Sequence, residues 1–188
     1  MPSIGPEQAI RDFLSAAGRP ITPQADSGET GWRAEASSGG FDARPETVRF
    51  GKMRAAGRRR VYIVTCETQS GQRMRFICHV RQEESGVWRF DGASGGSADG
   101  APQRRGHPWV NLGGGGWPQR FYAGGQVLEH GDTVARVRLR AANGVTLEDT
   151  LDDDAIVLFL AEDVVRLPIS AELLDAAGQV VARRDALG

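Results

Sequence analysis

The segment Gly92-Ala-Ser-Gly-Gly-Ser-Ala-Asp-Gly-Ala-Pro-Gln-Arg-Arg-Gly106 divides this chain of 188 residues into two parts with different sequence patterns. Five of its fifteen residues are glycine, and none is a large apolar residue. Burying so little apolar surface does not offset the entropy lost on ordering, which predicts a flexible linker or a long exposed loop. We therefore expect one module over residues 1–92, a Gly-rich linker over 93–118 and a second module over 119–188.

The composition is that of an ordinary globular protein, with 40% hydrophobic and 25% charged residues. The longest apolar run, residues 155–161, is far shorter than the roughly 18 residues that span a bilayer. The first residues contain no basic stretch followed by an apolar one, so no secretory signal is predicted. We expect a cytoplasmic protein that makes no membrane contact and needs no cofactor.

The N-terminal part is predicted to be one helix followed by an antiparallel meander. Apolar residues at the spacing of one helix face predict a helix over residues 7–17. Alternating apolar residues then predict strands over residues 32–36, 47–55, 60–68, 73–83 and 87–91. Gly51 is expected at a β-bulge in the second of these. A helix covering one apolar face of such a sheet is an α+β arrangement.

The two cysteines are predicted to be free, buried thiols. A three-residue turn over residues 69–71 places Cys66 opposite Met74 and Cys78 opposite Tyr62 in the hairpin. The two thiols would then lie roughly 13 Å apart along the ladder. A disulfide needs its Cα atoms within about 7 Å, so this pairing excludes one.

The order of helix and curled meander, ending in Gly86-Val-Trp-Arg-Phe-Asp-Gly92, resembles the cystatin-like or nuclear-transport-factor-like α+β fold over roughly residues 4–92. Larger members of that group close a ligand pocket with further helices, whereas residues 19–46 here contain no predicted helix. This departure from the larger members counts against a deep pocket here. In the alternative in which the module encloses a ligand pocket, Tyr62, Asp12 or Asp91 would serve proton transfer, although no spacing in the sequence requires it.

The C-terminal part is predicted to be an all-β sandwich, which makes the chain mainly β overall. Short alternating segments predict strands over residues 120–123, 126–129, 133–141, 155–161, 166–174 and 179–184. Asn143-Gly144 indicates a hairpin in which Leu139 faces Leu147 and Arg138 faces Glu148. Residues 155–161 are apolar at every position, so they are expected to form the central strand.

The ending Glu172-Leu-Leu-Asp-Ala-Ala-Gly-Gln-Val-Val-Ala182 resembles the last hairpin of many bacterial immunoglobulin-like domains. The resemblance covers roughly residues 119–186. Such domains mostly bind or support other structures, so it implies a binding or structural role and no reaction.

Four aromatic residues cluster around the Gly-rich connection: Trp109, Trp117, Phe121 and Tyr122. They either pack into a seam between the two parts or form an exposed contact patch. We expect packing inside the protein. The first 106 residues carry 16 basic and 12 acidic residues and the remainder 7 and 12, so opposite charges make self-association plausible.

Three charged or glycine-rich runs are candidate binding sites. The run 113–116 lacks the helix and Lys-Ser/Thr ending of a phosphate loop, and is interpreted as a mobile connection. Arg58–Arg60 is interpreted as a charged hairpin tip, because the aromatic interleaving of nucleic-acid binders is missing. The acidic run 148–154 lacks EF-hand spacing, so a solvated turn is expected and no metal site is predicted.

No spacing in the chain indicates a catalytic set. The three histidines are far apart in sequence, and His79 is predicted on the strand face opposite Cys78, beside Arg75, Ile77 and Arg81. No nucleophile elbow or metalloprotease motif occurs. The sequence favours a non-catalytic interaction or scaffolding protein. The alternative is a small-molecule binder or an isomerase- or cyclase-like enzyme that uses the interior of the N-terminal module.

Overall fold

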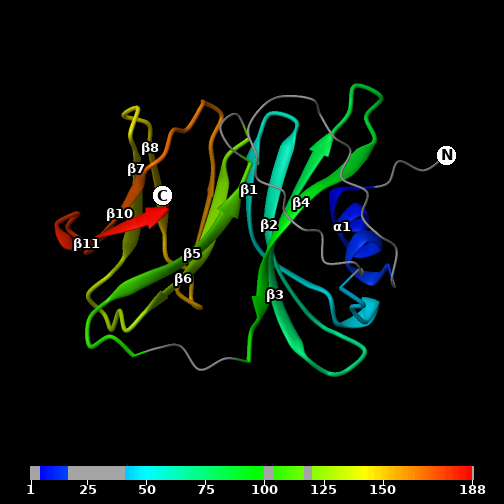
Figure 1. Cartoon of the computed structure of the whole chain (residues 1–188), viewed down its shortest axis with the longest axis horizontal. Coiled ribbons are helices and arrows are strands. Elements are labelled where there is room, and N and C mark those ends of the chain that lie inside the picture. The colour runs from blue at the N-terminus through cyan, green and yellow to red at the C-terminus, as the bar shows by residue number, and fades with distance from the viewer. Residues whose placement is uncertain (1–4, 17–40, 100–103, 117–119, 188) are drawn as a thin grey trace.

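The computed structural model describes residues 5–16, 41–99, 104–116 and 120–187. One helix and three antiparallel sheets follow one another as four layers (Figure 1). The helix covers a sheet ordered β1-β2-β3-β4, which packs on a sheet ordered β5-β6-β9, which packs on a sheet ordered β11-β10-β7-β8. The predicted class, one helix on an antiparallel meander followed by packed β-sheets, is confirmed.

Helix α1 spans Pro6–Ser15 and is anchored by its apolar face. Pro6 occupies the first turn, where its missing N–H costs nothing, and Glu7 lies near the positive helix end. Ile10 and Leu14 are fully buried, and the Phe13 ring stacks on Phe90 with centroids 3.5 Å apart. The helix predicted from the apolar spacing is therefore present and lies on the sheet as expected.

The first sheet follows the predicted meander. After the short 3-10 helix Pro45–Thr47, its strands are β1 Arg49–Ala56, β2 Arg59–Glu67, β3 Arg73–Gln82 and β4 Trp88–Ser97. The register of β1 shifts between Phe50 and Met53, which confirms the bulge expected at Gly51. The strand predicted over residues 32–36 lies outside the described residues.

The predicted hairpin register is confirmed, because Tyr62 pairs with Cys78 and Cys66 pairs with Met74. Both cysteines are free and buried in the core beneath α1, as expected. Burial raises the pKa of both thiols, and that of Cys78 strongly. They behave as small apolar core residues.

Parts of the expected linker are strands. β4 continues to Ser97 because β3 extends back to Arg73 and offers it a partner along its whole length. Strand β5, Trp109–Gly115, contains most of the glycine run that the sequence analysis interpreted as a mobile connection. That interpretation is wrong for residues 113–115, while the division of the chain into two modules stays a prediction.

The middle sheet is completed by β6, Tyr122–Leu128, and β9, Ile156–Leu160. β6 is one strand where two short strands were predicted, and β9 lies at the edge of its sheet, not at its centre. β9 is nevertheless apolar on both faces because the sheet is covered on both sides. Its Ile156 and Leu158 face the first sheet, and its Val157 and Phe159 face the third.

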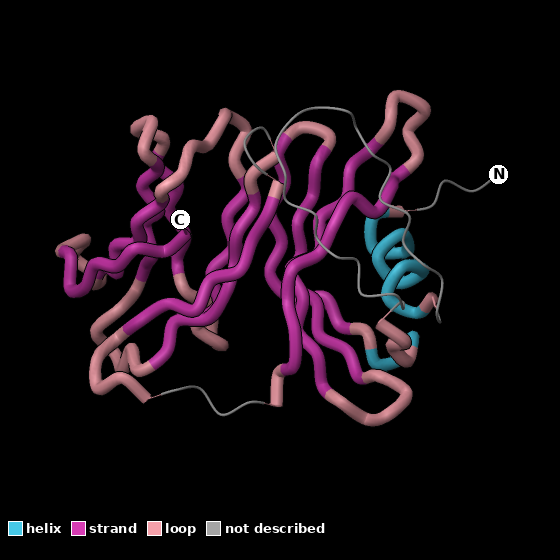
Figure 2. Tube along the Cα trace, in the orientation of Figure 1, coloured by secondary structure: helices cyan, strands magenta, loops and turns pink. Residues whose placement is uncertain are grey.

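The third sheet consists of β7 Arg136–Ala141, β8 Thr146–Thr150, β10 Ile169–Leu174 and β11 Val180–Leu187 (Figure 2). Leu139 faces Leu147 and Arg138 faces Glu148, as predicted. The Arg138 Nε donates to Glu148 at 2.9 Å. In the part of the chain that the structure describes, no helix has the length and apolar character needed to cross a bilayer.

Candidate functional site

The three residues expected to line an N-terminal pocket do not come together. Tyr62 is buried in the core between α1 and the first sheet, where burial raises its pKa. Asp12 is exposed on the helix and accepts a hydrogen bond from Gln8 at 2.7 Å. Asp91 contacts His79, whose side chain lies on the opposite face of the sheet from the Tyr62 side chain.

The aromatic residues predicted to form a seam are internal in the part of the chain that the structure describes. Phe121 is buried between the middle and third sheets, and Tyr122 is buried between the first and middle sheets. Trp109 is 7% exposed at the start of β5, with the Arg105 guanidinium 4.0 Å from its ring centroid. Trp117 lies outside the described residues. The three described rings therefore pack inside the protein, and a seam formed by all four residues stays a prediction.

A buried polar cluster lies where the first sheet meets Tyr122. His79 is 1% exposed, its Nδ1 lies 3.3 Å from Asp91 Oδ2, and its ring stacks on Tyr122 at 5.2 Å. The His79 ring lowers the pKa of Asp91, helped by the charges of Arg120 and Arg81, against the opposing effect of burial. Alternation predicts His79 on this face of β3. No sequence pattern predicts its partners, because Asp91 lies on β4 and Tyr122 on β6.

We predict that Asp91 makes the stability of the protein sensitive to acid. Because the folded-state pKa is lowered, the ionised carboxylate stabilises the fold at pH values above about 3.9, the ordinary value for Asp. This contribution disappears as the pH falls through the lower, folded-state pKa. Urea unfolding should therefore show the wild type more stable than Asp91→Asn at pH 7, with the difference shrinking below about pH 4.

The control for this measurement is Asp12→Asn, which changes an exposed carboxylate on the far side of the sheet. It should alter the free energy of unfolding little at either pH. A difference between wild type and Asp91→Asn that stayed constant from pH 7 to below pH 4 would contradict the prediction.

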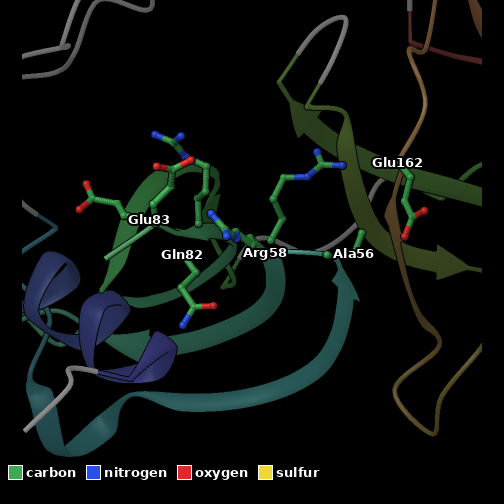
Figure 3. A pocket seen from close by; sticks show the side chains of 9 residues that line it. Ala56, Arg58, Gln82, Glu83 and Glu162 are labelled. Carbon is green, nitrogen blue, oxygen red and sulfur yellow. The ribbon is translucent and has the colours of Figure 1, made fainter. Parts of the chain in front are cut away.

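One surface cleft of about 500 Å³ lies at the β1–β2 turn, and Figure 3 shows Glu162 across it from Arg58 and Glu83. Its charged lining residues are Arg58, Arg59, Arg81, Glu83, Glu84 and Glu162. Arg59 donates to the carbonyl of Ala161, and the Arg60 guanidinium lies over the Trp88 ring. Arg59 and Arg60 are thus used in separate internal contacts, while Arg58 lines the cleft, whose charged residues are as often acidic as basic.

A second cleft, of about 540 Å³, separates the first sheet from the middle sheet. We call it the inter-sheet cleft. Side chains alternate along strands, so every second residue of each facing strand lines it. Its wall on the first sheet includes Arg75, Ile77, Ser94 and Gly96, and its wall on the middle sheet includes Asn111, Gly113, Gly124 and Gln126.

Glycine residues, which have no side chain, line both walls of this cleft. A Cβ on Gly96 would meet no atom within 4 Å, so the space in front of this residue is open. A Cβ on Gly113 would lie 2.9 Å from Ser94 Oγ, on the opposite wall. Gly96 and Gly113, two glycines of the expected linker, therefore belong to strands, and they line a cavity between two sheets.

Apolar packing closes the inner end of the inter-sheet cleft. Its lining residues Ile63 and Ile77 belong to the core that joins the two sheets, together with Tyr122, Ile156 and Leu158. A Cβ on Gly124 would lie 2.9 Å from Leu158 Cδ1 and 3.3 Å from Ile63 Cδ1, so the layers touch there. Elsewhere the lining includes Trp109, Leu128 and Ala98.

Among the described residues that line the inter-sheet cleft, Arg75 alone is charged. Its NH1 donates to Gln126 Oε1 at 3.0 Å, and the Gln126 side-chain amide donates to the carbonyl of Asp154 at 3.1 Å. This pair of bonds links the two walls and fixes the position of the guanidinium. The cleft thus combines an apolar inner end with one held cation.

A buried ion pair joins β1 of the first sheet to β8 of the third sheet, beside β9 of the middle sheet. Lys52 Nζ lies 2.7 Å from Asp149 Oδ2, and Arg54 also contacts this carboxylate. Asp149 Oδ2 further accepts the backbone N–H of Leu158 at 2.7 Å. Lys52 donates as well to the carbonyl of Ile156 at 3.0 Å. Asp149 of the acidic run is therefore a partner for two cations of β1.

Comparisons of the chain with protein-family models, with curated proteins and with solved structures give no significant match. The site is therefore interpreted from its own geometry.

Proposed function

We propose that the protein is a non-catalytic interaction protein that binds an extended segment of a partner protein in the inter-sheet cleft. The observation that carries this proposal is the position of the cleft between two sheet edges. β4 is one of the two outer strands of the first sheet, and β5 is one of the two outer strands of the middle sheet. An outer strand offers unpaired backbone groups, and an added peptide strand is a common way to satisfy them.

The lining of the cleft suits a backbone. A Cβ on Gly96 would meet no atom within 4 Å, so this residue presents no side chain that would keep an incoming main chain away. The volume of about 540 Å³ is within the usual range for binding sites, which is roughly 300–1,000 Å³. Apolar side chains of the segment would be buried against Ile63 and Ile77 at the inner end.

The alternative, a small-molecule binder or enzyme using the N-terminal interior, receives less support. In the described part of the chain, that interior is filled by stacked and tilted rings, among them Phe13, Phe41, Phe76 and Phe90. Asp12 points to solvent, and Tyr62 packs edge-on against Phe50. The proposed site is on the other face of the same sheet.

The resemblances to cystatin-like and bacterial immunoglobulin-like modules agree with this proposal at the level of the fold, and they name no partner. A cytoplasmic location and self-association through oppositely charged parts remain predictions.

The test is a binding selection with random N-acetylated peptides of about six residues, whose extended length of about 20 Å suits a strand. Protein and peptides are mixed and passed through gel filtration, and the retained peptides are identified by mass spectrometry. The wild type should retain a defined subset. Gly96→Leu should reduce that retention at least about tenfold, because the new side chain fills open space in the cleft without a clash.

The matched control is Thr146→Leu, which adds the same side chain at an exposed position of β8, in the third sheet. It should retain the same peptides as the wild type. Equal retention by Gly96→Leu and the wild type would exclude the inter-sheet cleft as the peptide-binding site. No retained peptide, together with a native-mass adduct that is lost on denaturation, would favour the small-molecule alternative.

A further inference from the structure

We infer that the bound segment is a chain end whose terminal carboxylate is held by Arg75. This inference rests on the proposed function and adds the chemistry of the ligand. Arg75 lies on β3, on the face that the sequence analysis predicted, and its side chain is partly buried. It supplies the one charge that the described residues place in a cleft whose inner end is apolar.

The charge of Arg75 is not balanced within the described part of the chain. There the guanidinium makes a hydrogen bond to the neutral Gln126 amide, and it makes no ion pair. Other guanidinium groups of the sheets do meet carboxylates, such as Arg54 with Asp149 and Arg138 with Glu148. A partly buried cation without an anion is a site where binding an anion recovers the cost of lost hydration.

The geometry of the guanidinium suits a carboxylate. An arginine side chain has five N–H donors in a planar fork, and one of them is used on Gln126. The remaining donors can hold both oxygens of a carboxylate, which is the strongest common type of charge-assisted hydrogen bond. Ser94 and Asn111 line the same cleft and supply further polar groups.

The shape of the cleft favours a chain end over a chain that passes through. The Arg75–Gln126 hydrogen bond connects the two walls, so a segment that reaches Arg75 meets a bridge. Ile63, Ile77 and Gly124 line the inner end, where the two sheets are in contact. A terminal carboxylate ends the chain at the position where the cation is held, and the residues before it can lie along β4.

The experiment compares two versions of the random peptide library, one with free carboxyl termini and one with C-terminal amides. The wild type should retain the free acids at least about tenfold better than the amides, because a charge-assisted hydrogen bond contributes about 1.5–3 kcal/mol. Arg75→Gln should lose this preference while still folding, since glutamine can occupy the same strand position. Arg73→Gln, an exposed change on the same strand, should keep the preference.

The outcomes separate the two proposals. If the wild type retains acids and amides equally, the carboxylate anchor is excluded while peptide binding in the cleft stands. If the retained amides are enriched in Asp or Glu, a side chain and not a chain end meets Arg75, which overturns the inference. If Arg75→Gln still prefers the free acids, Arg75 is excluded as the residue that binds the terminal carboxylate. Retention of neither library overturns the proposed function and the inference together.

Discussion

Asp149→Ala is expected to lower the free energy of unfolding by about 3–5 kcal/mol, the cost of removing one partner of a buried ion pair. The Asp149 side chain is fully buried, and the Lys52 side chain beside it is 13% exposed. The substitution would leave that ammonium without its carboxylate in a site that water barely reaches. It would also remove the acceptor of the Leu158 N–H. Urea unfolding monitored by far-UV circular dichroism measures the loss.

The matched control is Glu148→Ala, on the neighbouring residue of the same strand. Glu148 pairs with Arg136 and Arg138 on the outer face, where these side chains are about a quarter to a third exposed. Removing the Glu148 carboxylate should lower the free energy of unfolding by about 1 kcal/mol or less, because solvent-accessible ion pairs contribute little to stability. Similar losses for the two variants would show that burial of Asp149 does not set the strength of the contact.

Gly95→Ala should destabilise the protein by about 1–3 kcal/mol or more, the range for forcing an extra group into a packed region. A Cβ at this position would lie 2.2 Å from the Arg75 carbonyl oxygen and 2.8 Å from Phe76 Cα. Both are backbone atoms of the paired strand, so neither can rotate away. The measurement is the shift of the urea midpoint at unchanged slope.

The neighbouring glycine provides the comparison. Gly96→Ala places its methyl group in the open space of the inter-sheet cleft, so it should not lower the free energy of unfolding. It should even stabilise the strand by about 0.5–1 kcal/mol, because glycine loses more backbone freedom on folding than alanine. If the two alanine variants changed the free energy of unfolding by the same amount, this would contradict the assignment of Gly95 to the packed face and Gly96 to the cleft.

The elements predicted correctly from the sequence are those that local rules determine. The spacing of Ile10 and Leu14 defines the buried face of α1, and turn length with alternation defines the pairing of Cys66 with Met74. The same rules gave the pairing of Arg138 with Glu148. Each depends on residues close in sequence, where periodicity and turn chemistry leave few alternatives.

The glycine-rich strands were missed because they lack the apolar residues by which strands are recognised. A signal was nevertheless present in the lengths of the predicted strands. The strand expected over residues 73–83 was about twice as long as the partner expected over 87–91, which left half of its edge unpaired. β4 fills that edge by continuing through Ser94 and Gly96. A long strand beside a short one is a reason to extend the short one.

The cleft and the ion pair could not be predicted because both depend on how the sheets stack. Lys52 and Asp149 are distant in sequence, and no local pattern indicates that β1 lies beside β8 and β9. The same holds for Arg75 and Gln126. Alternation along the strand predicts the face on which Arg75 lies, but the position of the middle sheet determines which residues it meets.

The middle sheet, covered on both sides, also determines how this chain would behave if it were cut. A fragment that ended near residue 99 would present Val61, Ile63 and Ile77 to water, and one that began near residue 104 would present Tyr122, Ile156 and Leu158. These two apolar surfaces fit each other, so each fragment would be prone to aggregate alone. Produced together, they would behave as a split protein whose halves recognise one another without a covalent link.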